Sequence, residues 1–322
     1  MEVKETLIKE VFPIMSKHHR IGNMVVPVGE YDEDDPEDKK LASQVPAPYP
    51  GFMFLGSLIK PTLLAMAKKH NVLLTGVTGS GKTMLFVMLA QKLNLPLTRL
   101  NLNSEEGRPE IIGYLGIPDP SDPEDDGYKM PALVRAIQRP GVVLLDEWDA
   151  GRAEVTLCLQ RLLEDHQPGL FLVERDEFIP KHPHCFIGAT ANTRGLGDET
   201  GLYAGTQPQN FAQLNRFHVI LEMQPPPPKT VKHILEAHEF DGGRTLSKEV
   251  LGAMTDFYEA VLAAYNAGNL EAPLSLRSII HFAEYYQDVG PAAIHLVILQ
   301  KLPSEVSRNV VLELGKRFKL AS

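Results

Sequence analysis

The sequence predicts an α/β domain built on a parallel sheet flanked by helices, followed by a small all-helical domain. Between residues 52 and 224, short apolar segments alternate with segments of helical periodicity, which is typical of a parallel sheet covered by helices. Four consecutive prolines at residues 225–228 then predict a rigid connector. From residue 229 to residue 322 only helical periodicity remains, and this stretch is expected to form the second domain.

The first 51 residues are expected to form an N-terminal arm. Its main features are an acidic run, with seven carboxylates between Glu30 and Asp38, and a proline-rich segment between Val45 and Gly51. The formal net charge of the chain is -9, and without those seven carboxylates it is -2. The acidity is therefore one local patch, so composition alone does not exclude a nucleic-acid partner.

Composition places the chain among ordinary globular proteins. Hydrophobic residues make up 43% and charged residues 23%, which excludes a fibrous or wholly disordered chain. Cys158 and Cys185 are the only cysteines, too few for a disulfide framework and typical of a reducing compartment. The N-terminus lacks the apolar core of a secretory signal, and no apolar run approaches the ~18 residues of a membrane span. We therefore expect a cytoplasmic protein without membrane association.

The α/β domain is expected to consist of short, regularly spaced elements. Its predicted strands are residues 71–75, 97–102, 141–145, 186–190 and 219–221, and its predicted helices are residues 59–69, 82–93 and 153–165. The last of these helices is expected from the apolar stripe formed by Val155, Cys158, Leu159 and Leu162. In the second domain, helices are expected over residues 229–239, 248–265, 275–286, 291–302 and 304–318.

The strongest motif lies between the first of these strands and the helix that follows it. Its residues are Gly76, Val77, Thr78, Gly79, Ser80, Gly81, Lys82 and Thr83, which match the phosphate-binding pattern G-x-x-x-x-G-K-[ST]. Glycines let backbone N–H groups turn toward a polyphosphate, and the helix that begins at Lys82 adds its positive dipole end. We expect Lys82 to reach the β and γ phosphates of a nucleotide and Thr83 to ligate Mg²⁺.

Two further strand ends carry polar side chains. Asp146 and Glu147 follow the strand expected at residues 141–145, and Asn192 follows the strand expected at residues 186–190. In open parallel sheets, ligands bind at the carboxyl ends of the strands. We therefore expect Asp146 to hold Mg²⁺ through water, Glu147 to polarise the attacking water, and Asn192 to hydrogen-bond that water or the γ phosphate.

Two arginines are candidates for contact with the γ phosphate. Arg216 precedes the strand at residues 219–221, and Arg277 lies near the start of the helix at residues 275–286. Arginine stabilises the charge that accumulates on a phosphoryl group during transfer, from the same chain or from a neighbouring one.

Together, these motifs resemble those of the AAA+ ATPases, over a stretch from residue 52 to the end of the helical domain. Within that superfamily the sequence is most similar to the MoxR-like branch and, more narrowly, to the CobS-type ATPase subunits of aerobic cobaltochelatases. Three runs outside the general nucleotide motifs carry the closer resemblance: residues 146–152 (DEWDAGR), 160–164 (QRLLE) and 189–207 (ATANTRGLGDETGLYAGTQ). The chain departs from the common pattern at Asn215, where Asp is frequent, and at Leu276, where Pro is frequent.

The resemblance implies a ring, commonly a hexamer, that binds ATP with Mg²⁺ and completes each site with a neighbouring subunit. Arg216 resembles the arginine finger that acts in trans, and Arg277 resembles the sensor-2 arginine of the lid. In CobS-type proteins the ring pairs with a CobT-like partner bearing a von Willebrand A domain and acts on a large chelatase subunit that inserts Co²⁺ into a corrin ring. Hairpins expected near residues 107–130 and 169–185 would face the pore or the partner.

Other readings of the same motifs differ in the partner or in the use of the nucleotide. A MoxR-like chaperone with a client other than a chelatase would share this core. A nucleic-acid motor or restriction-type NTPase is disfavoured, because the two expected hairpins carry more carboxylates than cations. A module that binds nucleotide only in order to assemble is disfavoured by the intact Glu147.

Overall fold

The computed structural model divides the chain into two compact units. The first comprises Met1–Pro48, Phe54–Gly76 and Lys82–Glu222, and the second comprises Tyr49–Met53, Val77–Gly81 and Met223–Ser322. The structure describes residues 1–102, 107–119, 121–122, 126–193, 195, 197, 205–206, 208–240 and 243–321.

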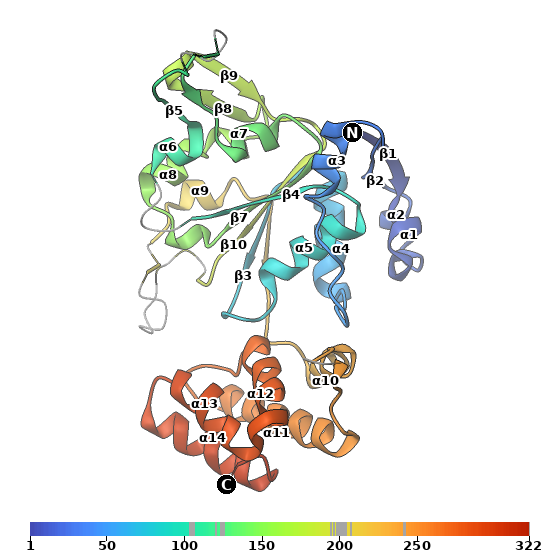
Figure 1. Ribbon diagram of the computed structural model, residues 1–322, viewed down its shortest axis with the longest axis vertical. Coiled ribbons are helices and arrows are strands. Elements are labelled where there is room, and N and C mark those ends of the chain that lie inside the picture. The colour runs from blue at the N-terminus through green and yellow to red at the C-terminus, as the bar shows by residue number, and fades with distance from the viewer. Residues whose placement is uncertain are drawn as a thin grey trace. The chain divides into compact units, whose positions relative to one another are not determined.

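A five-stranded parallel sheet forms the centre of the first unit, which confirms the α/β class (Figure 1). The strand order is β11-β3-β10-β7-β4, and all neighbouring strands run parallel. The strands are β3 (Val72–Thr75), β4 (Leu97–Asn101), β7 (Gly141–Asp146), β10 (Cys185–Thr190) and β11 (Val219–Glu222). The three inner strands are buried along their whole length, which is why each appears in the sequence as a continuous apolar run.

The register of the sheet brings polar residues to one edge. Asp146 at the end of β7 lies opposite Asn101 at the end of β4. Thr190 at the end of β10 lies opposite Leu74 on β3, one residue before the end of that strand. Because all these strands run in the same direction, their carboxyl ends meet at the same edge, where the loop after β3 also begins.

Helices cover both faces of the sheet. In Figure 1, α4 (Gly56–Ala67) and α5 (Lys82–Lys92) lie on one side of the sheet. On the other side lie α6 (Arg108–Ile112), α8 (Ala153–Cys158) and α9 (Phe211–Leu214). Helix α7 (Ala132–Ile137) packs on β7 and β4. The contact between α5 and β10 is very close, because a Cβ added at Gly188 would lie 2.4 Å from Cε1 of Phe86.

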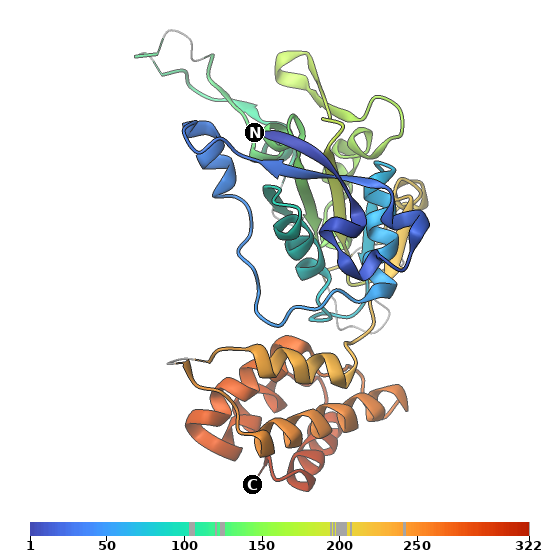
Figure 2. The same cartoon turned by 90° about the vertical axis from the view of Figure 1, so that its right-hand side faces the viewer.

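Residues Met1–Pro48 of the segment that we expected to be an arm fold as part of the first unit (Figure 2), and the end of that segment belongs to the second unit. Its elements are β1 (Glu2–Leu7), α1 (Ile8–Val11), η1 (Pro13–Met15), α2 (His19–Gly22), β2 (Val25–Glu30) and α3 (Pro36–Ala42), and β1 pairs antiparallel with β2. The end of β2 is attached to the end of α5, since the Gly29 N–H donates to the Leu93 carbonyl at 3.0 Å. The acidic run starts a helix, because the Asp35 carboxylate caps α3 by accepting from the Glu37 N–H at 2.9 Å.

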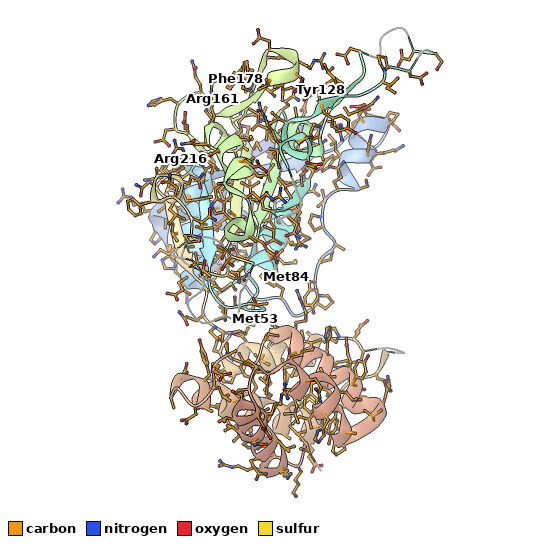
Figure 3. The ribbon with its side chains drawn as sticks, turned by 90° about the vertical axis from the view of Figure 1, so that its left-hand side faces the viewer. Met53, Met84, Tyr128, Arg161, Phe178 and Arg216 are labelled. Carbon is orange, nitrogen blue, oxygen red and sulfur yellow. The ribbon has the colours of Figure 1, made fainter. Side chains whose placement is uncertain are left out.

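Two hairpins extend from the first unit in the regions where the sequence predicted them. One is formed by β5 (Tyr114–Leu115) and β6 (Tyr128–Lys129), and the other by β8 (Gly169–Leu172) and β9 (Glu177–Pro180). The Arg175 side chain joins them, with Nη2 2.9 Å from Asp126 Oδ2 and the guanidinium 5.1 Å from the centre of the Tyr128 ring. Tyr128 is labelled in Figure 3.

The helix predicted over residues 153–165 is shorter than expected. Helix α8 ends at Cys158, and the 3₁₀ turn η3 (Arg161–Leu163) follows it. The apolar stripe is nevertheless kept, since Val155, Leu159 and Leu162 are fully buried. Hydrogen bonds from residue i+3 to residue i preserve the buried positions while the α-helical bonding stops, as in the bond from Leu162 N to Leu159 O.

The second unit contains helices whose buried side chains form a separate hydrophobic core. They are α10 (Pro228–Ala237), α11 (Lys248–Asn266), α12 (Leu276–Val289), α13 (Ala293–Val297) and α14 (Glu305–Arg317). Serines 247, 275 and 304 cap three of these helices. The single helix predicted over residues 291–302 is instead α13 flanked by the 3₁₀ turns η6 (Gly290–Ala292) and η7 (Leu299–Lys301). Within the described residues, no helix is long and apolar enough to cross a bilayer.

Candidate nucleotide site

The phosphate-loop lysine lies at the carboxyl edge of the sheet. Lys82, the first residue of α5, is 7% exposed. Its ammonium group donates to the Gly76 carbonyl at 2.7 Å and to Asn192 Oδ1 at 3.0 Å. The first unit therefore brings together the start of the loop, its lysine and the candidate asparagine that follows β10. Gly81, just before the lysine, has a φ of +102°, which strongly favours glycine.

The middle of the loop, residues Val77–Gly81, belongs to the second unit. There the Gly79 carbonyl accepts a hydrogen bond from the Leu276 N–H at 3.2 Å. A Cβ added at Gly79 would lie 2.4 Å from Ser275 Cβ, so glycine is required at this close approach. Arg277, the next residue of α12, is exposed.

Asp146 is the centre of a buried hydrogen-bond network at the end of β7. The Thr83 hydroxyl donates to its carboxylate, with Oγ1 3.1 Å from Oδ1 and 3.3 Å from Oδ2. The Thr190 hydroxyl, at the end of β10, also donates to Oδ1. The backbone N–H of Glu147 donates in turn to Thr190 Oγ1 at 3.1 Å. One carboxylate thus connects the phosphate-loop helix with two neighbouring strand ends.

Glu147 has a strained backbone at the site. Its φ of +57° and ψ of 45° lie in the left-handed region, which non-glycine residues adopt at an energetic cost. The residue marks the point where β7 ends and the turn η2 (Trp148–Ala150) begins. Its side chain is exposed, so the carboxylate remains accessible to water.

Asp149 holds the backbone beside Asn192. Its side chain is fully buried, and Oδ2 accepts from the Asn192 N–H at 3.0 Å and the Thr193 N–H at 2.8 Å. The Thr193 hydroxyl donates to the same oxygen at 2.8 Å. The other oxygen, Oδ1, is buried without a hydrogen-bond partner among the described residues. Asp149 therefore fixes the loop that positions the Asn192 amide on Lys82.

Burial and charge act in opposite directions on Lys82. Burial lowers the pKa of the Lys82 ammonium to about 8, and the carboxylates of Asp149, Asp146 and Glu147 oppose this shift. Phosphates brought to this ammonium would replace hydration that burial has removed. Arg99 on β4 adds a cation at the same edge, where its half-exposed guanidinium forms an ion pair with Asp146 Oδ2.

The donors at this edge fit a hard divalent cation. Thr83 supplies a hydroxyl and Asp146 a carboxylate, and oxygen ligands of this kind bind Mg²⁺ together with phosphates and several waters. The hydrogen bond between Thr83 Oγ1 and Asp146 Oδ1 brings the hydroxyl and the carboxylate together at the start of α5. Thr83 and Asp146, which the sequence predicted as Mg²⁺ ligands, are therefore in contact, and their binding of Mg²⁺ stays a prediction.

Arg216 lies in the first unit, but its described contacts are with other residues. It follows α9, and its guanidinium contacts Ala212, Gln160 and Glu164. Its expected role in a neighbouring subunit stays a prediction. Residues 194, 196, 198–204 and 207 of the distinctive run lie outside the described residues.

Sequence reasoning assigned no site role to Thr190, Asp149 or Arg99. Each had a weak signal: Thr190 is a polar residue at the end of an apolar strand, and Asp149 is a carboxylate in a segment that is otherwise buried. Arg99 is a cation in a strand whose pairing with β7 only the sheet register reveals.

Comparisons with known proteins agree with these features. Residues 71–238 match the AAA domain of the dynein-related subfamily. The chain is 31% identical over 280 residues to the aerobic cobaltochelatase subunit CobS of Sinorhizobium sp., which covers 86% of this chain and 84% of CobS.

Two further similarities are more limited. The chain is 33% identical over 156 residues to midasin of Dictyostelium discoideum, which covers 47% of this chain but only 2% of midasin. Among solved structures, a mutant RuvB of Thermotoga maritima aligns with a TM-score of 0.47 and 16% identity, over 84% of this chain and 73% of RuvB.

Proposed function

Because the chain belongs to the dynein-related AAA domains and is an AAA+ ATPase of the MoxR/CobS-like family, we propose that it is the motor subunit of a ring that remodels a protein client. The observation that carries this proposal is the pair of hydrogen bonds from Lys82 to Asn192 and from Thr83 to Asp146. These bonds support the proposal, because they join the lysine and the threonine of the phosphate loop to the strand ends where we expect the phosphates and Mg²⁺ to bind.

Each site residue has a distinct role in the proposed hydrolysis of ATP. The backbone of residues 76–81 and the Lys82 ammonium bind the phosphates, while Thr83 and Asp146 hold Mg²⁺. When bound, Mg²⁺ neutralises phosphate charge. Glu147 accepts the proton of the attacking water, and Asn192 orients that water or the γ phosphate. The products are ADP and inorganic phosphate.

Completion of each site by a neighbouring subunit is part of the proposal. We assign Arg216 as the finger that stabilises the transferring phosphoryl group in trans, and Arg277 as the sensor arginine of the helical lid. The support for the finger is the position of Arg216 just after α9, where its described guanidinium contacts are with Ala212, Gln160 and Glu164. We further propose that the subunits form a hexameric ring in the cytoplasm. Each subunit would contribute an α/β domain, residues 52–224, and a helical lid, residues 229–322.

A subunit-mixing experiment tests the finger. Lys82→Ala subunits lack phosphate binding but keep Arg216, whereas Arg216→Ala subunits have the opposite defect. Mixed rings should recover part of the ATPase activity, since some interfaces then join an intact loop to an intact finger. No recovery at any mixing ratio would contradict the role of Arg216 in trans.

For the client, we propose a large chelatase subunit that inserts Co²⁺ into a corrin ring, with a CobT-like partner bearing a von Willebrand A domain. This finer assignment is supported by the match to CobS, which extends over 84% of that protein. The match to midasin is confined to about half of this chain, so the core alone does not specify the client.

Trapping the client distinguishes the alternatives. Glu147→Gln should preserve ATP binding and ring formation but abolish hydrolysis, because an amide cannot accept the water proton. Purification of this variant in ATP should retain the chelatase subunit. Retention of another protein would instead support a MoxR-like chaperone, and retention of DNA would support a nucleic-acid motor. Undiminished ATP turnover by Glu147→Gln would refute the proposed base.

A further inference from the structure

The turn η3 is flanked by two polar side chains that both contact Arg216. Gln160 precedes the turn, and Glu164 follows it. Glu164 Oε1 lies 3.5 Å from Arg216 Nη2. With its amide oxygen facing the guanidinium, Gln160 accepts from both Nη atoms, at 3.1 Å from Nη1 and closer still from Nη2. These two residues begin and end the QRLLE run, for which the nucleotide site provides no role.

The donors of Arg216 are almost fully used within its own chain. A guanidinium has five N–H groups. Nη1 donates to the Ala212 carbonyl at 2.7 Å and to Gln160, while Nη2 faces Gln160 and Glu164. Nε is buried and has no acceptor among the described residues, so it does not offer its hydrogen to an incoming group. The side chain as a whole is 22% exposed. In this conformation Arg216 is directed onto its own subunit.

The backbone around this contact is firmly held. Asn71 is 3% exposed, and its Nδ2 donates to the Leu163 carbonyl at 2.9 Å and to the Arg216 carbonyl at 3.3 Å. The Arg161 guanidinium stacks over the Phe178 ring of β9 at 4.0 Å. Figure 3 shows Arg161 and Phe178 together, with Arg216 on the same side of the first unit. Movement of the guanidinium therefore requires rotation of its side chain and not displacement of the backbone.

We propose that Gln160 and Glu164 clamp Arg216 in a retracted position, from which the γ phosphate of a neighbouring subunit withdraws it. This inference rests on the proposed role of Arg216 as a finger in trans. The clamp and the phosphate both offer oxygen acceptors, and they compete for the same N–H groups. Within the clamp, Glu164 carries a negative charge as the phosphate does, whereas Gln160 contributes a neutral amide oxygen. The Glu164 side chain is 44% exposed, so its hold is weak enough for a phosphate to displace it.

The clamp lowers the fraction of time in which the finger reaches the phosphate. Glu164→Gln and Glu164→Ala should therefore raise kcat, and the weakness of exposed ion pairs limits the rise to about two- to fivefold. The KM for ATP should not change, because the phosphate loop of each subunit is untouched. Gln160→Ala should act in the same direction, since it removes the acceptor that both Nη atoms share.

Glu154→Gln is the matched control. Glu154 is an exposed glutamate whose Oε1 lies 3.5 Å from Arg152 Nη1, the same separation as in the Glu164 pair. This variant should leave kcat unchanged. Equal or lower kcat in Glu164→Gln than in the unaltered protein would overturn the clamp, because a residue that positions a finger for use lowers kcat when it is lost.

A double-variant cycle separates this inference from the function beneath it. In an Arg216→Ala background, Glu164→Ala should have no further effect on kcat, because the clamp then has nothing to hold. A rise in kcat in that background would overturn the clamp. If Arg216→Ala alone leaves kcat intact, the finger itself is wrong. If Arg216→Ala lowers kcat and Glu164→Ala does not raise it, only the clamp is wrong. Thermal unfolding of each variant checks that the fold is kept.

Discussion

Replacement of Asp149 by alanine tests how strongly the site depends on a residue that touches no phosphate. The Asp149 carboxylate is fully buried and accepts from two backbone N–H groups and from the Thr193 hydroxyl. In Asp149→Ala the hydroxyl can rotate to another acceptor, but the N–H groups of Asn192 and Thr193 cannot. We expect the loop to shift so that water can reach these groups, and the Asn192 amide to leave Lys82.

The structure sets the size of both effects. A buried N–H group left without an acceptor costs ~1–3 kcal/mol. The N–H groups of Asn192 and Thr193 are only part-buried and regain water when the loop shifts, so the free energy of unfolding of the first unit should fall by less than the full ~2–6 kcal/mol for two such groups. A displacement of about 1 Å at a catalytic group costs up to ~100-fold in rate, so kcat should fall by ~10- to 100-fold. Asp149→Asn keeps an acceptor for the same N–H groups, and we expect it to lose ~1–2 kcal/mol of stability.

Urea unfolding, monitored by tryptophan fluorescence, measures the change in the free energy of unfolding. Trp148 is the single tryptophan of the chain, is 1% exposed and adjoins Asp149, so its emission reports on this part of the first unit. Asp256→Ala, at an exposed position on α11, is the control for loss of an aspartate. If Asp149→Ala unfolds at the same urea concentration as the unaltered protein and keeps its kcat, the argument from buried hydrogen bonds is refuted.

Three further predictions concern the first unit. Burial lowers the pKa of Lys82 to about 8, and phosphates favour the charged ammonium. The affinity for ATP should therefore be constant below that pH and fall about tenfold per pH unit above it. Nucleotide titrations at a series of pH values check this, and an affinity that does not change with pH would contradict it. Gly188→Ala should lower the free energy of unfolding by ~1–3 kcal/mol, because its Cβ would meet the Phe86 ring, and an unchanged urea midpoint would argue against the close contact. Arg99→Ala should reduce the Mg²⁺ concentration for half-maximal hydrolysis, because the guanidinium competes with the cation for Asp146, whereas a higher requirement would show that Arg99 assists binding.

The sequence was most informative where a physical constraint acts locally. A parallel strand covered on both faces must be apolar along its whole length, so β3, β7 and β10 could be recognised from their residues alone. The residues after such strands gather at one edge, so the sequence could assign Lys82 and Asn192 to one site, although their hydrogen bond with each other was not predicted.

Features that depend on distant partners were not predictable. The apolar stripe after Ala153 is compatible both with one long α-helix and with α8 followed by the turn η3. Only the packing of the turn distinguishes these two structures. A run of carboxylates suggests a solvated arm, yet Asp38 is 4% exposed because its carboxylate accepts from the Asp32 N–H and pairs with the N-terminal ammonium. The partners of Asp149 and Glu164 likewise lie far along the chain.

At position 147, the left-handed backbone and the proposed hydrolysis of ATP favour different residues. A glycine there would relieve ~1–2 kcal/mol of strain, and an asparagine would tolerate the conformation better than a glutamate does. Neither would keep the carboxylate. Laboratory evolution of this chain for heat resistance alone should therefore tend to discard the carboxylate at position 147. Under the proposed mechanism, the resulting proteins would be more stable and would bind ATP without hydrolysing it.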